Sequence, residues 1–256
     1  MKLKEIFDKL ETIAPVALSN EFCAKFKMYD NSGIIIDCKE DIKGALFSLD
    51  LSFKAIEEAK KRGFNLIVTH HPAIFGGISR ISADDLIGTC LKCGISVISM
   101  HLNFDAAPCG IDYHLMRGLG GEKAEILDEI QGGGYGRVYS VKEVKFGELE
   151  SAVCKNFNTQ RALFYGDKEK KIKKVASFCG AGCNNEAIAF AKCHGADAFV
   201  SSDMKHHEIA ALIEKGINVI HLTHYSAENY GFNKIYTQIS SAFSIPTAYF
   251  ADKDLL

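Results

Sequence analysis

Short apolar runs rich in β-branched residues alternate with helical patterns along most of this 256-residue chain. Such runs, when bounded by glycine or polar residues, are typical of buried strands. They lie at 33–37, 64–69, 95–100, 175–179, 196–202 and 217–223. The segments between them have helical spacing and often end at a glycine, which can terminate a helix. The alternation predicts an α/β protein with largely parallel strands.

Helical patterns include the segment 41–63 and the N-terminal sequence MKLKEIFDKLETIAP, whose charges are interleaved as in an amphipathic helix. A triple glycine at 132–134 breaks the rhythm, and an edge strand and a helix are expected after it. We therefore expect two closely packed α/β lobes. The first would comprise 1–125 with 222–256, and the second 126–221.

Two adjacent histidines stand at the end of one predicted strand, in the motif IVTHHPAIF. Successive side chains of a strand point to opposite faces, so His70 and His71 could face one site only if the strand has already ended. Pro72 makes that ending expected, because it lacks a backbone N–H and disfavours helix at the preceding residue. Loops that leave strands commonly carry binding groups.

Two further motifs, HLNFD and HYSAE, also follow predicted strands. Each places a carboxylate four residues after a histidine: Asp105 after His101, and Glu228 after His224. Ligands of open α/β sheets bind at the carboxyl ends of strands, so these side chains are expected to converge with the histidine pair. If HYSAE is the first turn of a helix, its two ligands share one helix face.

Six imidazole and carboxylate groups exceed what one tetrahedral ion with an open position requires. They suit two divalent ions roughly 3.5–4 Å apart that share a bridging carboxylate and a water. Zinc, iron, manganese and nickel all accept such ligands, so the metal stays open. A lone histidine after a strand is more often a hydrogen-bonded loop residue, but repetition of the motif favours ligation.

The other histidines are expected to have structural roles. His114 and His194 are assigned to surface or capping positions, and His221 to a strand interior. His206 and His207 are expected to begin a helix after a serine or aspartate cap.

Nine cysteines without a secretion signal fit reduced, mostly buried thiols. A structural zinc site built from the pairs Cys90–Cys93 and Cys179–Cys183 is the alternative, although zinc sites usually take thiolate pairs from short knuckles. The loop CGAGCNN before a predicted helix also leaves an anion site open, but a tight turn explains it equally well.

The balance of 30 basic and 32 acidic residues gives a formal net charge of −2. This charge provides no electrostatic footprint for a nucleic-acid backbone. Apolar stretches are of strand length and fall far short of the roughly 20 residues that a membrane helix needs. We therefore expect a cytoplasmic protein without membrane or nucleic-acid partners.

The motifs VTHHPAIF, HLNFDAAPCG and HLTHYSAE together resemble the hallmark motifs of the NGG-one-interacting-factor-three family, whose bacterial members are labelled GTP cyclohydrolase type-two homologues. Weaker matches at YDNSGIIID, GGGYGRVYS, FCGAGC and SSDMKHHE extend the resemblance over nearly the whole chain. It implies two α/β lobes with mixed, largely parallel sheets, a two-metal cleft between them, and ring-shaped homohexamers. The metal ligands that it implies are His70, His71, Asp105, His224 and Glu228, with Glu228 as the bridge.

Two functions remain open at this point. The first is a metal-dependent hydrolase of a nucleotide or other small molecule, in which His101 moves the proton. The family label points to GTP, but no residue pattern here specifies guanine. The second is a metal-handling or regulatory protein without turnover. A purely structural ring protein is disfavoured, because a buried ligand cluster costs desolvation unless it is occupied.

Overall fold

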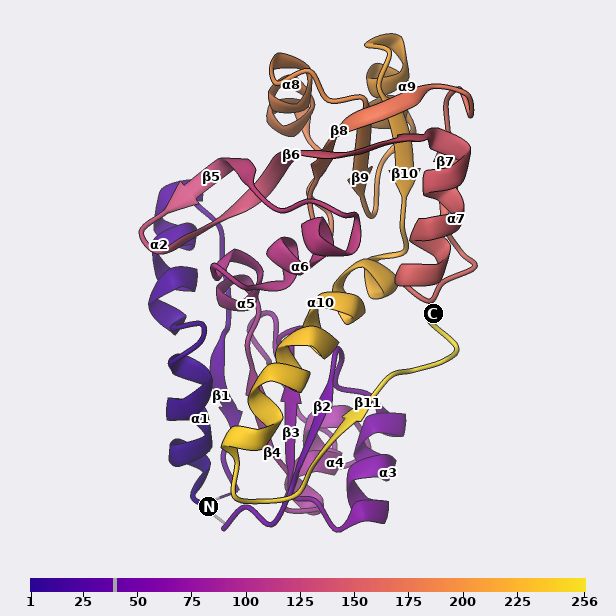
Figure 1. The fold of residues 1–256 in the computed structure, drawn as a ribbon. Coiled ribbons are helices and arrows are strands. Elements are labelled where there is room, and N and C mark those ends of the chain that lie inside the picture. Colours follow the sequence, from indigo (N-terminus) through magenta and orange to yellow (C-terminus); the bar gives the residue numbers. More distant parts are fainter. Residues whose placement is uncertain (39–40) are drawn as a thin grey trace. The chain divides into compact units, whose positions relative to one another are not determined.

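The computed structural model describes residues 1–38 and 41–256 (Figure 1). The chain divides into two compact units, built around separate sheets. The first unit comprises 1–107, 130–132 and 232–252, and the second comprises 108–129, 133–231 and 253–256. The predicted mixed α/β fold with two largely parallel sheets is confirmed. The lobe boundaries drawn from the sequence, and the cleft, stay predictions.

The first unit contains a five-stranded sheet in the order β1-β4-β3-β2-β11. Its strands are β1 (Gly33–Ile36), β2 (Ala45–Ser48), β3 (Leu66–Thr69), β4 (Ser96–Ser99) and β11 (Thr247–Phe250). Its helices are α1 (Leu3–Glu11), α2 (Val16–Phe26), α3 (Phe53–Arg62), α4 (Leu86–Lys92), α5 (Leu102–Ala106) and the short 3-10 helix η1 (Ser240–Ala242). All neighbours in this sheet pair in parallel except β1, which is antiparallel to β4.

Both faces of this sheet are covered. Every residue of β2, β3 and β4 is buried, as is typical of parallel strands packed on two sides. Because side chains alternate along a strand, Leu46 joins a core cluster with Ile56 of α3 and Cys90 of α4. The next residue, Phe47, contacts the ring of Phe232 in helix α10 (His224–Ile239), with ring centroids 6.3 Å apart.

The carboxyl ends of the three central strands lie level with one another. Ser48 pairs with Thr69, and Thr69 pairs with Ser99. The residues that follow these strands therefore leave the sheet along one edge, which is where open α/β sheets bind ligands.

The helix predicted over 41–63 is wrong in its first half. Residues 45–48 form β2, and α3 begins only at Phe53. A short apolar run buried on both faces shows no alternation, so periodicity cannot distinguish it from a helix segment. Both ends of α3 are capped in the usual way. At its N-terminus the Ser52 hydroxyl accepts from the Ala55 N–H at 3.1 Å, and at its C-terminus Gly63 adopts the left-handed conformation with φ +69°.

The second unit contains a six-stranded sheet in the order β5-β6-β8-β9-β10-β7. Its strands are β5 (Ala124–Ile130), β6 (Gly133–Lys145), β7 (Leu163–Tyr165), β8 (Lys171–Ser177), β9 (Ala198–Ser201) and β10 (Asn218–His221). Its helices are α6 (Ile111–Gly118), α7 (Phe146–Asn156), α8 (Asn185–Cys193), α9 (His206–Glu214) and the start of α10. Among the described residues, none of the helices is long and apolar enough to cross a membrane.

In this sheet β8, β9 and β10 run parallel, whereas β6 and β7 are antiparallel to their neighbours β8 and β10. The edge strand predicted after the triple glycine is wrong, because β6 lies between β5 and β8. Its residues Val138 and Tyr139 are buried, as an interior strand requires. The parallel strands again end along one edge, where His221 of β10 pairs with Ser201 of β9.

Candidate metal centre

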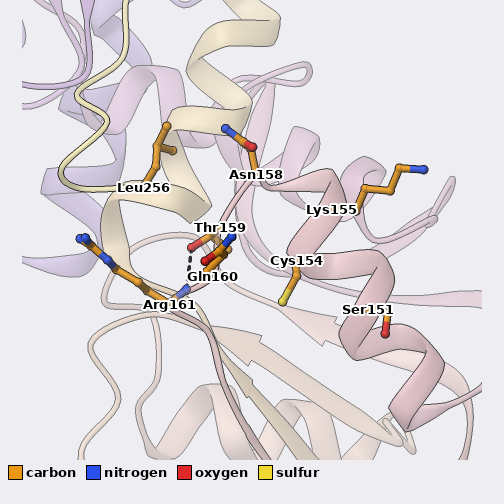
Figure 2. A pocket seen from close by; sticks show the side chains of 8 residues that line it. All are labelled: Ser151, Cys154, Lys155, Asn158, Thr159, Gln160, Arg161 and Leu256. Carbon is orange, nitrogen blue, oxygen red and sulfur yellow. Dashed lines mark hydrogen bonds between the residues drawn. The ribbon is translucent and has the colours of Figure 1, made fainter.

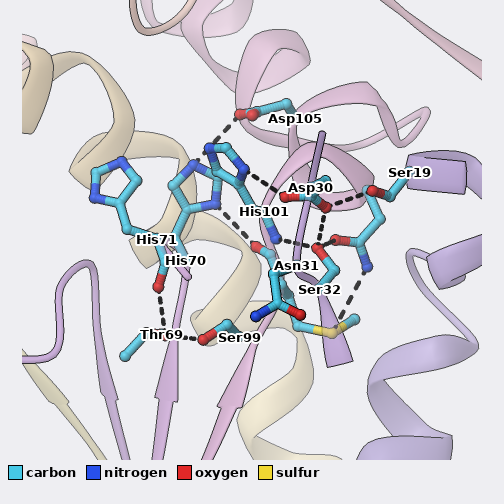
Figure 3. Close-up of polar contacts among 12 residues, drawn as sticks. Ser19, Asp30, Asn31, Ser32, Thr69, His70, His71, Ser99, His101 and Asp105 are labelled. Carbon is cyan, nitrogen blue, oxygen red and sulfur yellow. Dashed lines mark hydrogen bonds and ion pairs between the residues drawn. The ribbon is translucent and has the colours of Figure 1, made fainter. Parts of the chain in front are cut away.

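The first donor set consists of His70, His71, His101 and Asp105, all from the first unit (Figure 3). The first two follow β3, and His101 follows β4. One short helix, α5, then places Asp105 beside them. Ligand atoms of His70, His101 and Asp105 all lie within 4.8 Å of one another. This group can therefore hold a metal ion.

The backbone at the end of β3 explains how two adjacent imidazoles reach one site. The N–H groups of His70 and His71 both donate to the carbonyl of Leu49, at 3.1 and 3.0 Å. Two successive N–H groups that share one acceptor cannot continue a strand ladder, so the alternation of side chains is lost there. The two ring centroids consequently lie only 4.9 Å apart.

Hydrogen bonds fix the orientation of each ring in the first donor set. His70 Nδ1 lies 2.9 Å from the carbonyl oxygen of Met100, which only accepts, so this nitrogen carries the proton. His71 Nδ1 lies 2.6 Å from Asp50 Oδ1. An acceptor at Nδ1 makes Nε2 the ring nitrogen that could bind a metal. Metal-binding histidines are usually oriented by a hydrogen bond of this kind.

The fit of a cation is clearest at His70. Its ring is fully buried, and its Nε2 lies 3.5 Å from Asp105 Oδ1. With the proton on Nδ1, Nε2 presents a lone pair toward a carboxylate oxygen. A proton or a metal ion between these two atoms would stabilise this arrangement.

His101 forms a dyad with a buried carboxylate, since its Nδ1 lies 2.8 Å from Asp30 Oδ1. Burial alone would lower the pKa of His101, but the hydrogen bond to Asp30 and the charges of Asp105 and Asp30 outweigh it and raise that pKa. Burial works against the ionised form of Asp30, yet bonds from His101, Ser19 and Ser32 lower the pKa of this carboxyl to about 2. Asp30 is thus a fixed negative charge behind the ring.

The second donor set consists of His224 and Glu228 in the second unit. Helix α10 begins at His224, so the four-residue spacing places both on one helix face, and His224 Nε2 lies 3.0 Å from Glu228 Oε2. His224 Nδ1 lies 2.6 Å from Oδ2 of Asp203, which follows β9. The arrangement resembles that of His70: an oxygen acceptor lies at Nδ1, and a carboxylate oxygen faces Nε2.

The glycine turn after β8 closes around Glu228. Gly180 has φ +57°, and a Cβ added there would lie 2.5 Å from Glu228 Oε1. The preceding residue is held by Asp112, a fully buried carboxylate that accepts from the Cys179 N–H at 3.0 Å and forms an ion pair with Arg137. The motifs GGGYGRVYS and FCGAGC therefore build one support beneath the second donor set.

We predict that Gly180→Ala weakens metal binding by roughly 10–100-fold, because its Cβ displaces the Glu228 carboxylate. Equilibrium metal titration of purified protein measures this. Gly195→Ala is the matched control: Gly195 also has a positive φ, +69°, but a Cβ there meets nothing within 4 Å. Both variants share a backbone cost of about 1–2 kcal/mol. Equal metal affinity in the two variants would contradict the prediction.

Comparison with known proteins places the chain in a family. The family model for Duf34/NIF3 (NGG1p interacting factor 3) matches residues 1–252. The chain belongs to the DUF34/NIF3 family. A Clostridium perfringens protein named GTP cyclohydrolase 1 type 2 homolog is 32% identical over 237 residues, which cover 89% of this chain and 87% of that protein. The resemblance inferred from the three histidine motifs is thereby confirmed.

Solved structures agree with the fold of this DUF34/NIF3 protein. Staphylococcus aureus protein SA1388 superposes with a TM-score of 0.85 at 22% identity, covering 100% of this chain and 98% of that chain. A Methanocaldococcus jannaschii structure described as reduced HcgD has a TM-score of 0.79 at 27% identity and covers 98% of each chain.

The predicted ligands fall into two groups in this DUF34/NIF3 chain. The structure brings His70, His71, His101 and Asp105 together in the first unit, and His224 and Glu228 together in the second. A single site built from both groups stays a prediction. Sequence reasoning missed the carboxylates behind the rings, namely Asp30, Asp50 and Asp203. Their signal was weak: each lies near a strand, but no local spacing links it to its histidine.

Several assignments of the other histidines change. His114 is buried in α6, not at the surface, because that helix buries most of its residues. His194 is the C-cap residue of α8, as predicted. His206 begins α9 as predicted, but the cap is Lys205, whose N–H donates to Glu208 at 2.7 Å, rather than a serine or aspartate. His221 ends β10.

None of the nine cysteines, all of which lie in the described part of the chain, forms a disulfide bond. Burial is the main cause that raises the pKa of Cys90 and of Cys183 to about 12. Among residues 1–38 and 41–256, no grouped set of three ligand atoms includes Cys90, Cys93 or Cys183. The alternative of a structural zinc built on these cysteines therefore gains no support.

We predict that a thiol reagent labels native protein first at the exposed Cys109 and Cys193 and only slowly at Cys90 and Cys183. The thiolate is the reactive form, so a raised pKa and burial both slow labelling. Mass spectrometry of timed samples identifies the sites. Rapid labelling of Cys90 and Cys93 that added zinc abolishes would contradict it.

A pocket of about 630 Å³ lies in the second unit and contains none of the predicted ligands (Figure 2). It is lined by Ser151, Cys154, Lys155, Asn158, Thr159, Gln160, Arg161 and Leu256. The Lys155 and Arg161 side chains point in opposite directions, so their charges do not meet at a common point.

Proposed function

We propose that this DUF34/NIF3 protein is a metal-dependent hydrolase whose two donor sets together bind two divalent ions. The ligands would be His70, His71, Asp105, His224 and Glu228, with Glu228 as the bridge. The main support is one repeated arrangement: a histidine whose Nδ1 has an acceptor and whose Nε2 faces a carboxylate oxygen, at 3.5 Å in the first set and 3.0 Å in the second.

Bound divalent ions would supply an acidified water and polarise the bond to be cleaved. The chain's own contribution is the Asp30–His101 dyad. Asp30 holds Nδ1 of His101 in its protonated form, so Nε2 is the atom that accepts a proton from the water and returns it to the leaving group. Relatives carry the name GTP cyclohydrolase 1 type 2 homolog, which supports a nucleotide as the substrate.

The second candidate function is metal handling without turnover. The His224 side chain is 35% exposed, and Asp203 behind it is 55% exposed. Ligands that solvent reaches can exchange their ion, as a carrier requires. Imidazole and carboxylate donors also accept iron, zinc, manganese and nickel alike.

Metal stoichiometry and turnover, measured on the same samples, separate the two functions. Chelator-stripped protein would be reloaded with each metal in turn and analysed for bound ions, then assayed with GTP, other nucleotides, phosphoesters and cyclic amides. Hydrolysis that depends on the loaded metal supports the hydrolase. Reversible metal binding without hydrolysis of any compound would favour the metal-handling function, and at most one ion per subunit would refute the two-metal site.

We also propose a cytoplasmic homohexamer. Nine cysteines without a disulfide among the described residues fit a reducing compartment. The family resemblance is the reason for the ring-shaped hexamer, and exposed apolar side chains such as Ile34 and Leu163 are available for subunit contacts. Light scattering at micromolar concentration should give a mass near six times the 28.1 kDa chain. A monomer mass would reject the assembly.

A further inference from the structure

Two exposed aromatic side chains border the first donor set. Tyr29 and Phe75 are each 60% exposed, and their rings meet edge to face with centroids 6.3 Å apart. Phe75 also meets the ring of His101 edge to face, with centroids 6.2 Å apart. The two exposed rings thus form a continuous row of aromatic contacts from the solvent surface to His101, the histidine of the proposed proton relay.

The two segments that carry this pair are tied to each other and to the site. The Asn31 side-chain amide donates to the Ile74 carbonyl at 2.6 Å, which links the residues after Tyr29 to the residue before Phe75. Asp30, next to Tyr29, is anchored on His101. The backbone segments that carry the two rings are therefore tied together, and such preorganisation reduces the entropy lost on binding.

The chain after Phe75 is open to solvent. Phe75, Gly76 and Gly77 are all exposed, and a Cβ added at either glycine would meet nothing within 4 Å. Large aromatic side chains gain free energy mainly by burial, and two that stay largely exposed next to a polar cluster are suited to a ligand that covers them. A flat ring is the ligand that matches, because aromatic side chains offer stacking faces and edges to any heteroaromatic base.

We infer that Tyr29 and Phe75 form an aromatic platform that binds the planar heteroaromatic ring of the substrate and holds it beside His101. This inference rests on the proposed function, because it assigns the substrate class of the same site. The platform recognises the ring alone, so charged groups of the substrate would be left to the donor sets. Phe75 and Tyr29 act as positioning and specificity residues, not as ligands or acids.

Calorimetric titration of zinc-loaded protein tests the platform, with GTP as the ring-bearing probe and inorganic tripolyphosphate as the ring-free probe. We expect Phe75→Ala and Tyr29→Ala each to weaken GTP binding roughly 5- to 100-fold, the range found when a base loses an aromatic stacking partner. Tripolyphosphate binding and zinc content should not change. Phe75→Tyr should keep the affinity for GTP.

Phe53→Ala is the matched control, since Phe53 is an aromatic residue of the first unit that is 52% exposed but has no place in the platform. Its GTP affinity should equal that of the wild type. Full affinity in Phe75→Leu would overturn the claim that a planar side chain is needed. Equal losses for GTP and tripolyphosphate would overturn the ring assignment, as would wild-type protein that binds GTP no better than tripolyphosphate.

Two readouts keep this inference separate from the proposed function. Ring-dependent binding that needs Phe75, in protein that hydrolyses nothing, would leave the platform intact and remove the hydrolase. Hydrolysis with a KM for GTP that Phe75→Ala leaves unchanged would keep the hydrolase and remove the platform. A change in mass by light scattering in Phe75→Ala, with GTP binding unaltered, would assign the patch to a subunit contact and overturn the inference.

Discussion

Glu228→Gln should lose bound metal and, with it, turnover. The amide keeps the size of the side chain but removes the negative charge that faces His224 Nε2 at 3.0 Å. We expect the metal affinity to fall by more than the roughly 10–100-fold that follows loss of an outer partner, because a bridging ligand contacts both ions. Elemental analysis after metal loading, together with activity, measures both effects.

Glu186→Gln provides the control for this experiment. Glu186 is an exposed carboxylate in the first turn of α8, within the same unit but outside the donor set. It should bind metal as the wild type does. If Glu228→Gln retained two ions per subunit, Glu228 would not be the bridge.

His101→Ala should keep its metal and lose turnover by about 10²–10⁴-fold, the usual contribution of a general acid or base. Its ring is fixed by Asp30, and in the proposed function it moves a proton without binding an ion. Asp30→Asn should reduce turnover as well, because the amide can stabilise the wrong tautomer. Metal content and turnover measured side by side separate a proton relay from a ligand.

His206→Ala is the histidine control, since His206 is exposed at the start of α9. It should match the wild type in both measurements. Loss of metal in His101→Ala would instead make His101 a ligand. That outcome is physically possible, because its ligand atom lies within 4.8 Å of those of His70 and Asp105.

The gathering of His70, His71, His101 and Asp105 could be predicted because it depends on a rule of topology. The residues after β3 and β4 lie at one edge of a parallel sheet, and the chain order of strands already implies this. The placement of His224 and Glu228 on one face of α10 could also be predicted, because a spacing of four residues corresponds to about one helix turn.

The supporting carboxylates could not be predicted, and the reason is physical. Asp50 follows β2, which the sequence pattern merged with a helix, so its position at the sheet edge was hidden. Asp203 and Asp30 bond to histidines 21 and 71 residues away, and nothing in local spacing encodes such a contact. Hydrogen bonds between distant segments follow from tertiary packing alone.

In each donor set an imidazole nitrogen faces a carboxylate oxygen, and this pairing has a consequence for the exchange of protons and metal ions with solvent. In the proposed function, the position between His70 and Asp105, or between His224 and Glu228, would hold either a proton or a metal ion. An ion that enters would displace the proton, so metal uptake would release acid and acidic solution would drive the reverse exchange. Protons would then compete with the metal, and a protein with this function would exchange the two cations reversibly.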